Sequence, residues 1–301
     1  MNKKKIPCFT AKIDLSLADK LKNDLVSQGF TLHKPEYTIF QALKSGVTCT
    51  LYESGSLTVQ GKNKDEFIEF YLEPEILQSF VYTHPLATID FTPRIGVDEA
   101  GKGDYFGPLC TCALYADKLG IKKLIEMGVK DSKKLSDTTI LKMGKAIKED
   151  FHFSLVRLFP EKYNELYGKF HNLNRLLAWT HVAAIAEVQG KTNCNKAVID
   201  QFAEKQVMIT MLQQKKITID LDQRHRGEED VVVAAASILA RMAFVEGLQQ
   251  LGEKIGITLP KGASQEVIQA AKKILKCFGI EALDTLSKTH FKTRADILSS
   301  L

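Results

Sequence analysis

The stretch Arg94-Ile-Gly-Val-Asp98-Glu99-Ala-Gly101-Lys102-Gly103-Asp104-Tyr-Phe-Gly107-Pro108 decides how the rest of this chain is interpreted. A short apolar run ends in two adjacent carboxylates, Asp98 and Glu99, and then breaks into a turn rich in glycine. Adjacent acids repel each other, so local stability does not explain their presence where a strand should enter a core. Carboxylate oxygens suit Mg²⁺ or Mn²⁺, and glycines let backbone N–H groups approach a phosphate or a sugar. The stretch therefore favours a metal site over the alternative, a β-turn with solvated charges.

A second apolar run, Ala197-Val-Ile, ends in Asp200, and Glu204 follows four residues later. If a helix or turn begins there, Asp200 and Glu204 share one face. We expect Asp98 to end its strand and Glu99 to begin the turn, so that the two need not point to opposite faces of a sheet. Two cations about 4 Å apart can activate a water and stabilise a leaving oxygen, which would explain why several acids converge.

Four further blocks follow in order: Lys130-Asp-Ser132-Lys133-Lys134-Leu-Ser136, Asn172-Leu-Asn174-Arg-Leu-Leu-Ala-Trp179, Val198-Ile-Asp200-Gln-Phe and Val233-Ala-Ala-Ala-Ser237-Ile-Leu-Ala-Arg241. Together with the first stretch they cover roughly residues 93–295 and resemble the signature of the prokaryotic type 2 ribonucleases H, the group of ribonucleases HII and HIII. Five blocks in order are specific, where any one alone would be weak. The N-terminal extension and Leu259-Pro-Lys-Gly-Ala263 resemble ribonuclease HIII rather than HII.

The resemblance implies an endoribonuclease that hydrolyses the RNA strand of RNA/DNA hybrids with Mg²⁺ or Mn²⁺, leaving 5′-phosphate and 3′-hydroxyl ends. It implies that the catalytic and metal-binding acids are Asp98, Glu99, Asp200 and Glu204, with Asp98 bridging two metals. In ribonuclease HII the fourth acid comes from just before the Ala-Ala-Ser-Ile helix, which here would be Asp230 or a neighbouring Glu228 or Glu229. We favour Glu204, because the HIII type has an acid close after the third aspartate.

Substrate contacts also follow from the resemblance. In the family, the backbone of a Gly-x-Gly turn reads the 2′-hydroxyl, which distinguishes RNA from DNA at a given site. The expected substrate-binding residues are Gly101, Lys102, Gly103, Ser132, Lys133 and Lys134. Lys102 stands where HII enzymes typically carry Arg. The alternatives are HII-like cleavage at single ribonucleotides embedded in DNA and a non-catalytic nucleic-acid-binding protein on the same fold. A nucleotide-binding kinase is disfavoured because the chain has no Gly-x-x-x-x-Gly-Lys-Ser/Thr loop.

The chain divides into segments of different character. Residues 1–85 are expected to form a small α/β domain that resembles the TATA-box-binding-protein-like module of ribonuclease HIII, residues 86–93 a linker, and residues 94–301 a ribonuclease H catalytic domain. Residues 1–64 hold ten Lys against five acids, whereas residues 65–90 add six acids and no base. The basic half, with a polar strand surface carrying Thr58, Gln60, Lys62 and Lys64, could lie along a duplex; a structural or docking role is the alternative.

Hydrophobic periodicity predicts an α/β fold with a mixed central sheet flanked by helices. The N-terminal segment should contain strands near 9–15, 47–52 and 57–60, helices near 17–26 and 64–72, and a hairpin at 53–56. In the C-terminal segment we expect strands at 94–98, 110–115, 153–158, 197–199 and 217–221, with helices at 174–188, 231–251 and 265–278. Trp179 and His181, in a helix that is apolar nearly all round, are interpreted as packing residues.

Composition agrees with an intracellular enzyme. The chain has 301 residues and a net charge of +5, and 34 of its 41 basic residues are Lys. Lysine binds phosphates as a point charge and reads bases poorly, which favours contact with a nucleic-acid backbone. The six cysteines contain no Cys-x-x-Cys pair and are expected to be reduced thiols. We expect neither a signal peptide nor a membrane span, and therefore expect the protein in the cytoplasm. We also expect it to be a monomer.

Overall fold

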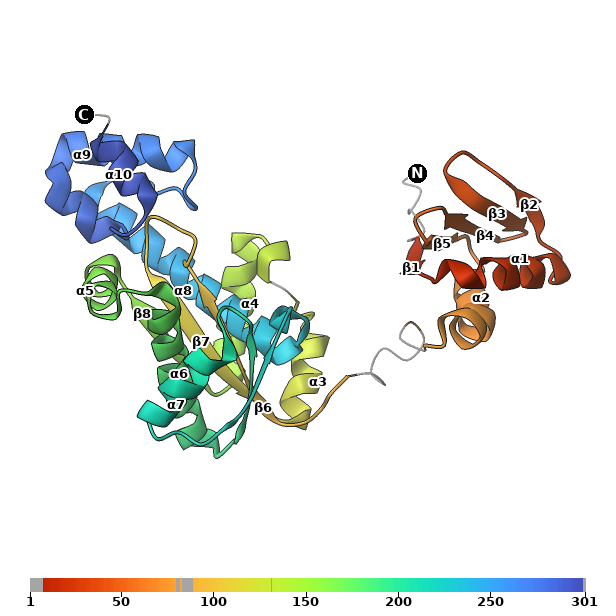
Figure 1. Cartoon of the computed structure of the whole chain (residues 1–301), viewed down its shortest axis with the longest axis horizontal. Coiled ribbons are helices and arrows are strands. Elements are labelled where there is room, and N and C mark those ends of the chain that lie inside the picture. The colour runs from red at the N-terminus through yellow and green to blue at the C-terminus, as the bar shows by residue number, and fades with distance from the viewer. Residues whose placement is uncertain (1–7, 80–81, 83–88, 131, 300–301) are drawn as a thin grey trace. The chain divides into compact units, whose positions relative to one another are not determined.

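The computed structural model describes residues 8–79, 82, 89–130 and 132–299, and it divides into two compact units, Met1–Asp90 and Phe91–Leu301 (Figure 1). Residues 86–88 of the expected linker lie outside the described part, and residues 89–93 form neither helix nor strand.

The N-terminal unit is a five-stranded antiparallel sheet with helices on one side. Its elements are β1 (Phe9–Lys12), the short 3₁₀ turn η1 (Leu15–Leu17), α1 (Ala18–Ser27), β2 (Thr31–His33), β3 (Thr38–Lys44), β4 (Val47–Tyr52), β5 (Ser56–Gln60), α2 (Lys64–Phe67) and a π-helical segment η2 (Ile68–Leu77). The strand order is β1-β5-β4-β3-β2. The predicted hairpin is confirmed, because β4 and β5 pair with Leu51 opposite Leu57. Alternate strand residues are buried against α1, for example Cys49 and Leu57 against Leu21.

The polar strand surface is only partly as expected. Thr58 is half-buried, while Gln60 and Lys62 are exposed. Lys64 lies elsewhere: it begins α2, its side chain is buried, and Nζ binds Asp65 and donates to the Tyr82 hydroxyl at 2.8 Å. The expectation for Lys64 was wrong because its strand ends at Gln60 and a turn carries the chain away from the sheet.

The C-terminal unit contains the predicted mixed sheet. Its strands are β6 (Arg94–Ala100), β7 (Leu109–Ala116), β8 (Phe153–Leu158), β9 (Lys196–Asp200) and β10 (Asp220–Arg224), in the order β10-β9-β6-β7-β8. Strands β10, β9 and β6 are parallel, and β7 and β8 are antiparallel to their neighbours. β10 begins three residues later than the predicted 217–221, because it pairs residue by residue with β9 from Lys196 onward.

Helices cover both faces of this sheet (Figure 1). They are α3 (Lys118–Glu126), the 3₁₀ turn η3 (Ser132–Lys134), α4 (Asp137–Asp150), α5 (Pro160–Phe170), α6 (Leu173–Thr192), α7 (Lys205–Gln214), the 3₁₀ turn η4 (Gly227–Glu229), α8 (Val231–Ile255), α9 (Gln265–Leu286) and α10 (Lys292–Leu298). α8 lies so close to β6 that a Cβ on Gly96 would sit 2.3 Å from the carbonyl carbon of Val232. In the described part of the chain, α8 alone is long and apolar enough to cross a membrane, and 78% of its apolar window is buried in this unit.

The chain's last two helices form a separate cluster at the end of α8 (Figure 1). They bury Val267, Ile274 and Leu283 against Tyr105 and Phe106, which follow the glycine-rich turn. An isolated antiparallel bridge between Phe106 and Ser287 joins this cluster to the loop that follows the glycine-rich turn. The C-terminal helices therefore contact the segment that the sequence marks as functional.

Candidate active site

One pocket of about 630 Å³ opens where β6 and β9 end. Its walls come from the two strand ends, the glycine turn, the loop before α4, α8 and the segment after α8. The lining residues are Asp98, Glu99, Ala100, Gly101, Lys102, Gly103, Asp104, Ser132, Lys133, Asp200, Ser237, Arg241, Phe244, Lys261 and Gly262. The structure thus brings together eight of the ten residues that the sequence singled out. The other two are Glu204, which lies elsewhere, and Lys134, whose side chain lies outside the described part.

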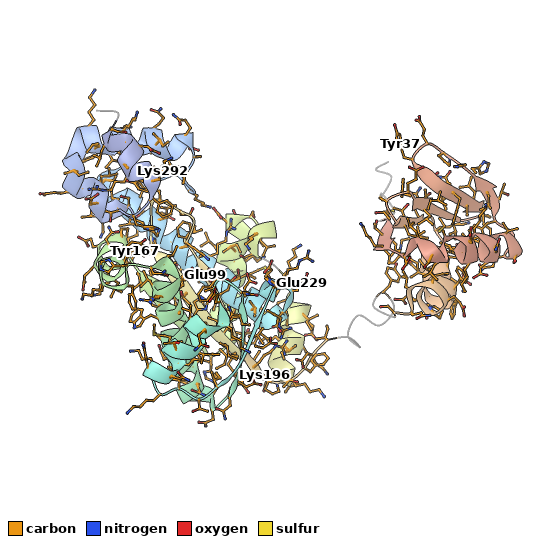
Figure 2. The ribbon with its side chains drawn as sticks, viewed as in Figure 1. Tyr37, Glu99, Tyr167, Lys196, Glu229 and Lys292 are labelled. Atoms are coloured by element: carbon orange, nitrogen blue, oxygen red, sulfur yellow. The ribbon has the colours of Figure 1, made fainter. Side chains whose placement is uncertain are left out.

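Asp98 and Glu99 belong to opposite faces of the sheet. β6 continues to Ala100, because Ala100 still pairs with Cys110 of β7, so the two acids are successive residues within the strand. Side chains alternate along a strand, and Asp98 accordingly points to α8 and Glu99 to α6. The expectation that Asp98 ends the strand was wrong. Both acids nevertheless line the same pocket, which lies at the open end of β6. Glu99 lies in the interior of this unit (Figure 2).

Asp98 sits on a chain of hydroxyl groups. Ser237 of α8 donates to its carboxylate, and Ser237 in turn shares a 2.7 Å hydrogen bond with the buried Ser132. Asp98 Oδ1 also accepts from the backbone N–H of Glu99 at 2.8 Å. Burial and the charge of Glu99 raise the pKa of Asp98 to about 7, although these hydrogen bonds oppose the shift. The charged form of this carboxylate is therefore disfavoured in the absence of a cation.

Glu99 has two basic neighbours. His181 Nε2 lies 3.0 Å from Glu99 Oε2, and Lys102 Nζ lies 3.5 Å from Oε1. Burial opposes the charge on Glu99, but the hydrogen bond and the charge of His181, together with Lys102, hold its pKa below the usual value. Phe202 covers both partners, with its ring 4.7 Å from the His181 ring and 5.7 Å from Lys102 Nζ. His181 is thus a partner of Glu99 and not only the packing residue that we expected.

Asp200 ends β9, as predicted, beside β6 in the parallel ladder. Its Oδ1 accepts from the Gly227 backbone N–H at 2.9 Å, and this bond ties the carboxylate to the turn that precedes α8. The loop between β10 and α8 therefore fixes the side of Asp200 that faces away from the pocket.

The two candidates for the fourth acid lie in different surroundings. Glu204 is exposed, precedes α7, and lines a neighbouring pocket of about 470 Å³ with Phe170 and Arg175. Asp230 is almost fully buried: Oδ2 accepts from Arg94 Nε at 2.8 Å, and Oδ1 accepts from the N–H of Val232 at 2.9 Å at the start of α8. Both oxygens of Asp230 thus have structural partners.

The glycine turn is built tightly at one position and openly at another. Gly101 has φ +86°, and a Cβ there would lie 2.2 Å from the Pro108 carbonyl oxygen and 2.8 Å from Phe244. Gly103 has no atom within 4 Å of the corresponding Cβ position. Steric packing therefore explains Gly101, whereas Gly103 leaves free space in the pocket.

Two cations in the pocket wall were not assigned by the sequence. Arg241 and Lys261 both line the pocket and both pair with Asp137, Arg241 Nη2 at 3.4 Å and Lys261 Nζ in a very short contact. The exposed Lys133 faces the same space and lowers the pKa of Asp98 slightly through its charge. Arg241 ends one sequence block that carries the family resemblance, and Lys261 lies in the middle of another, Leu259–Ala263, so the signal was present without a role attached to it.

The donor set suits a hard divalent cation. Asp98, Glu99 and Asp200 offer only carboxylate oxygens, the ligands that Mg²⁺ and Mn²⁺ accept. As their side chains are placed, no three His, Cys, Asp or Glu residues of the described part converge on one point. The pKa of Asp98 is raised by burial and by repulsion from Glu99, and a cation in the pocket would offset both effects.

Comparisons with known proteins identify the relatives of this chain. A family model described as "Ribonuclease HII" matches residues 95–294, and one described as "Domain of unknown function (DUF3378)" matches residues 9–81. The chain is 50% identical over 296 residues to "Ribonuclease HIII" of Protochlamydia amoebophila (strain UWE25), and the match covers 98% of each chain.

Solved structures of ribonuclease HIII proteins are also similar to this chain. The fold is similar to that of Bst-RNase HIII crystallised in complex with Mn²⁺, with 28% identity, a TM-score of 0.68 and coverage of 98% of this chain and 99% of that one. It is also similar to Aquifex aeolicus RNase H3, with 29% identity, a TM-score of 0.57 and coverage of 94% and 100%. The carboxylates at the strand ends, the glycine turn and these matches lead to one conclusion: the chain belongs to the ribonuclease HIII family and is a nuclease.

Proposed function

We propose that this endoribonuclease hydrolyses the RNA strand of RNA/DNA hybrids and leaves 5′-phosphate and 3′-hydroxyl ends, with Mg²⁺ or Mn²⁺ as cofactor. The observation that carries the proposal is the single pocket in which Asp98, Glu99 and Asp200 meet the glycine turn. The acids face a space that is bordered by cations and open backbone, as a site for a polyanionic phosphodiester requires.

Asp98, Glu99 and Asp200 would hold the divalent ions, which supply Lewis acidity and neutralise charge at the scissile phosphate when bound. The chain's own residues orient these ligands. Ser237 and Ser132 orient Asp98, His181 orients Glu99, and the Gly227 N–H orients Asp200. Such partners commonly fix the direction of a ligand's lone pairs.

We retain Glu204 as the fourth acid in this proposal. Asp230 is a poor alternative because its two oxygens bind Arg94 and cap α8, and a metal would have to displace both. Glu204 is exposed in the segment between Asp200 and α7, and to act as a ligand its carboxylate would have to turn from the neighbouring pocket toward this one. Comparing Glu204→Gln with Asp230→Asn in a cleavage assay tests this choice, and full activity of Glu204→Gln would eliminate Glu204.

The glycine turn would recognise the ribose of the RNA strand. Gly103 leaves room for a ribose against the backbone, and the 2′-hydroxyl offers a donor and an acceptor to the groups of Gly101, Lys102 and Gly103. Lys133 and Lys134 would contact phosphates, with Arg241 and Lys261 on the pocket wall. Because its hydroxyl is bonded to Ser237, Ser132 would support the substrate by holding the lysine loop in place.

In the N-terminal unit, the sheet face with Thr58 and Gln60, together with Lys62 in the turn after β5, would contact the duplex backbone without reading its sequence. Contacts of this kind add affinity that is lost at high salt. We further propose that the enzyme acts as a monomer in the cytoplasm. Light scattering during gel filtration checks the first point, and immunodetection in fractionated cells checks the second.

The activity is tested by gel analysis of matched RNA/DNA, DNA/DNA and RNA/RNA duplexes with and without Mg²⁺. We expect cleavage of the RNA strand of the hybrid in the presence of the metal, and no cleavage by a folded Asp98→Asn variant. Cleavage of DNA/DNA at a comparable rate would overturn the proposal.

We also expect the enzyme to need several consecutive ribonucleotides. An appended unit that holds the duplex favours long substrates, and Lys102 replaces the Arg that is typical of HII enzymes. A time course in Mg²⁺ should therefore show rapid cleavage of a continuous hybrid and slow cleavage at one ribonucleotide within a DNA duplex of equal length. Equal rates would support the HII-like alternative.

A further inference from the structure

The side of the glycine-rich loop that faces away from the pocket is paired with a segment from the C-terminal end of the chain. Phe106 and Ser287 form an antiparallel bridge, Gly107 N–H donates to the Leu286 carbonyl at 3.1 Å, and Lys288 N–H donates to the Tyr105 carbonyl at 2.9 Å. This pairing brings Lys288, which lies 184 residues after Asp104, directly behind the turn.

Lys288 is a fully buried cation, with 0% of its surface exposed. Its Nζ donates to the carbonyl oxygen of Asp104 at 2.8 Å and to that of Gly107 at 2.7 Å, and it lies 5.6 Å from the centre of the Tyr163 ring. Both hydrogen bonds go to the main chain of one loop. Burial lowers the pKa of Lys288 to about 8, so the interior position is costly for the charge.

The same loop is also held from another direction. Asp104 Oδ1 accepts from the Gly262 N–H at 2.6 Å, and the Tyr105 N–H donates to the Gly262 carbonyl at 2.9 Å. Residues 104–107 are therefore fixed by Gly262 and Lys288, and residues 101–103 remain facing the pocket. A long cation that joins carbonyls three residues apart sets the curvature of the loop more firmly than apolar packing would.

We propose that Lys288 is a positioning residue for hybrid recognition, which fixes the Asp104 and Gly107 carbonyls and thereby holds the Gly101–Gly103 backbone in the orientation that contacts the ribose. This inference rests on the proposed function of the pocket. Lys288 itself touches no substrate, because it is buried behind the loop. Its effect on the reaction is geometric, and a misplacement of about 1 Å at a reacting site can reduce a rate roughly 100-fold.

The test compares Lys288→Met and Lys288→Gln with the wild-type full chain. Met removes charge and donors at similar length, whereas Gln keeps an amide that can donate to one carbonyl. Lys292→Met is the matched control, because Lys292 lies four residues away, exposed at the start of α10 on the surface of the same cluster (Figure 2). Circular dichroism establishes the folded fraction of each protein. Steady-state cleavage of an RNA/DNA hybrid and anisotropy with hybrid and DNA/DNA duplexes in EDTA then measure kcat, KM and the ratio of the two Kd values.

We expect kcat/KM per folded molecule to fall at least tenfold in Lys288→Met, less in Lys288→Gln and not at all in Lys292→Met. The preference of the protein for hybrid over DNA should fall in the same order. A merely structural role would lower the folded fraction and leave both quantities unchanged, and that result would overturn the inference. If Lys288→Met does not fold, Lys288→Gln decides by the same criteria. Failure of the wild-type chain to cut the hybrid would instead refute the proposed function.

Discussion

Substitution by alanine should affect stability in opposite ways at the two glycines of the glycine turn, Gly101 and Gly103. At Gly101 an alanine must adopt φ +86° and place its Cβ 2.2 Å from the Pro108 carbonyl oxygen. The left-handed backbone costs about 1–2 kcal/mol and the overpacking about 1–3 kcal/mol, so Gly101→Ala should lose roughly 2–5 kcal/mol of stability. At Gly103 the Cβ meets no atom within 4 Å and φ is not in the left-handed region, so Gly103→Ala should keep or gain a few tenths of a kcal/mol.

Hybrid cleavage should distinguish the two variants in the opposite way, because we expect the larger direct effect on activity from Gly103→Ala. The Gly103 methyl would occupy pocket space that we assign to the ribose, so a fully folded Gly103→Ala protein should bind and cut the hybrid poorly. Urea unfolding followed by circular dichroism gives the stability of each variant, and initial cleavage rates give its activity. A Gly101→Ala protein within 0.5 kcal/mol of wild type, a threshold of roughly RT, would refute the packing argument. Wild-type cleavage by Gly103→Ala would refute the assignment of the open space to substrate.

Three further predictions concern the carboxylates, the buried lysine and the N-terminal unit. Asp98→Asn should remain folded and lose several orders of magnitude in hybrid cleavage, whereas Asp230→Asn should lose on the order of 3–5 kcal/mol in urea unfolding, because it removes the carboxylate charge from the buried ion pair with Arg94; the reverse pattern would contradict the assignment. The pKa of Lys288 is lowered to about 8 in the folded chain, so between about pH 8 and the usual pKa of 10.5 the unfolded chain binds more protons than the folded chain. The free energy of unfolding of the wild type should therefore rise with pH across that range, and it should rise less steeply in Lys288→Met. The midpoints of urea unfolding at several pH values measure this difference. A truncated chain that begins at Phe91 should show a KM that rises more than kcat falls and a shallower dependence of affinity on salt, and equal salt slopes in binding titrations would mean that the N-terminal unit does not touch nucleic acid.

Local sequence patterns were sufficient to place the strands that carry the acids. Apolar runs that stop at a carboxylate located β6 and β9 and gave the end of β9 correctly, and the apolar periodicity of α6 and α8 identified the helices that cover them. They did not predict β2 and β3. β2 has only three residues, and β3 contains a bulge between Thr38 and Phe40 that interrupts its alternation.

Three features in and behind the site depend on distant partners. β6 extends past Asp98 because β7 supplies hydrogen bonds as far as Ala100, and nothing in the local sequence reports the length of that ladder. His181 lies in an apolar helix, where packing is the usual explanation, and only the fold places it 3.0 Å from Glu99. Lys288 lies near the end of the chain, and its role depends on carbonyl groups that lie nearly two hundred residues earlier.

The alternation of Asp98 and Glu99 along β6 means that two neighbouring residues face different helical layers. Asp98 is oriented by the layer formed by α8, through Ser237, while Glu99 is oriented by the layer formed by α6, through His181. A substitution in one layer can therefore turn one carboxylate while the orientation of its covalent neighbour stays as it was. Because both acids are proposed metal ligands, this arrangement would allow the geometry of metal binding to change in small, separable steps during evolution, and an engineer could reorient either carboxylate from behind without touching the pocket itself.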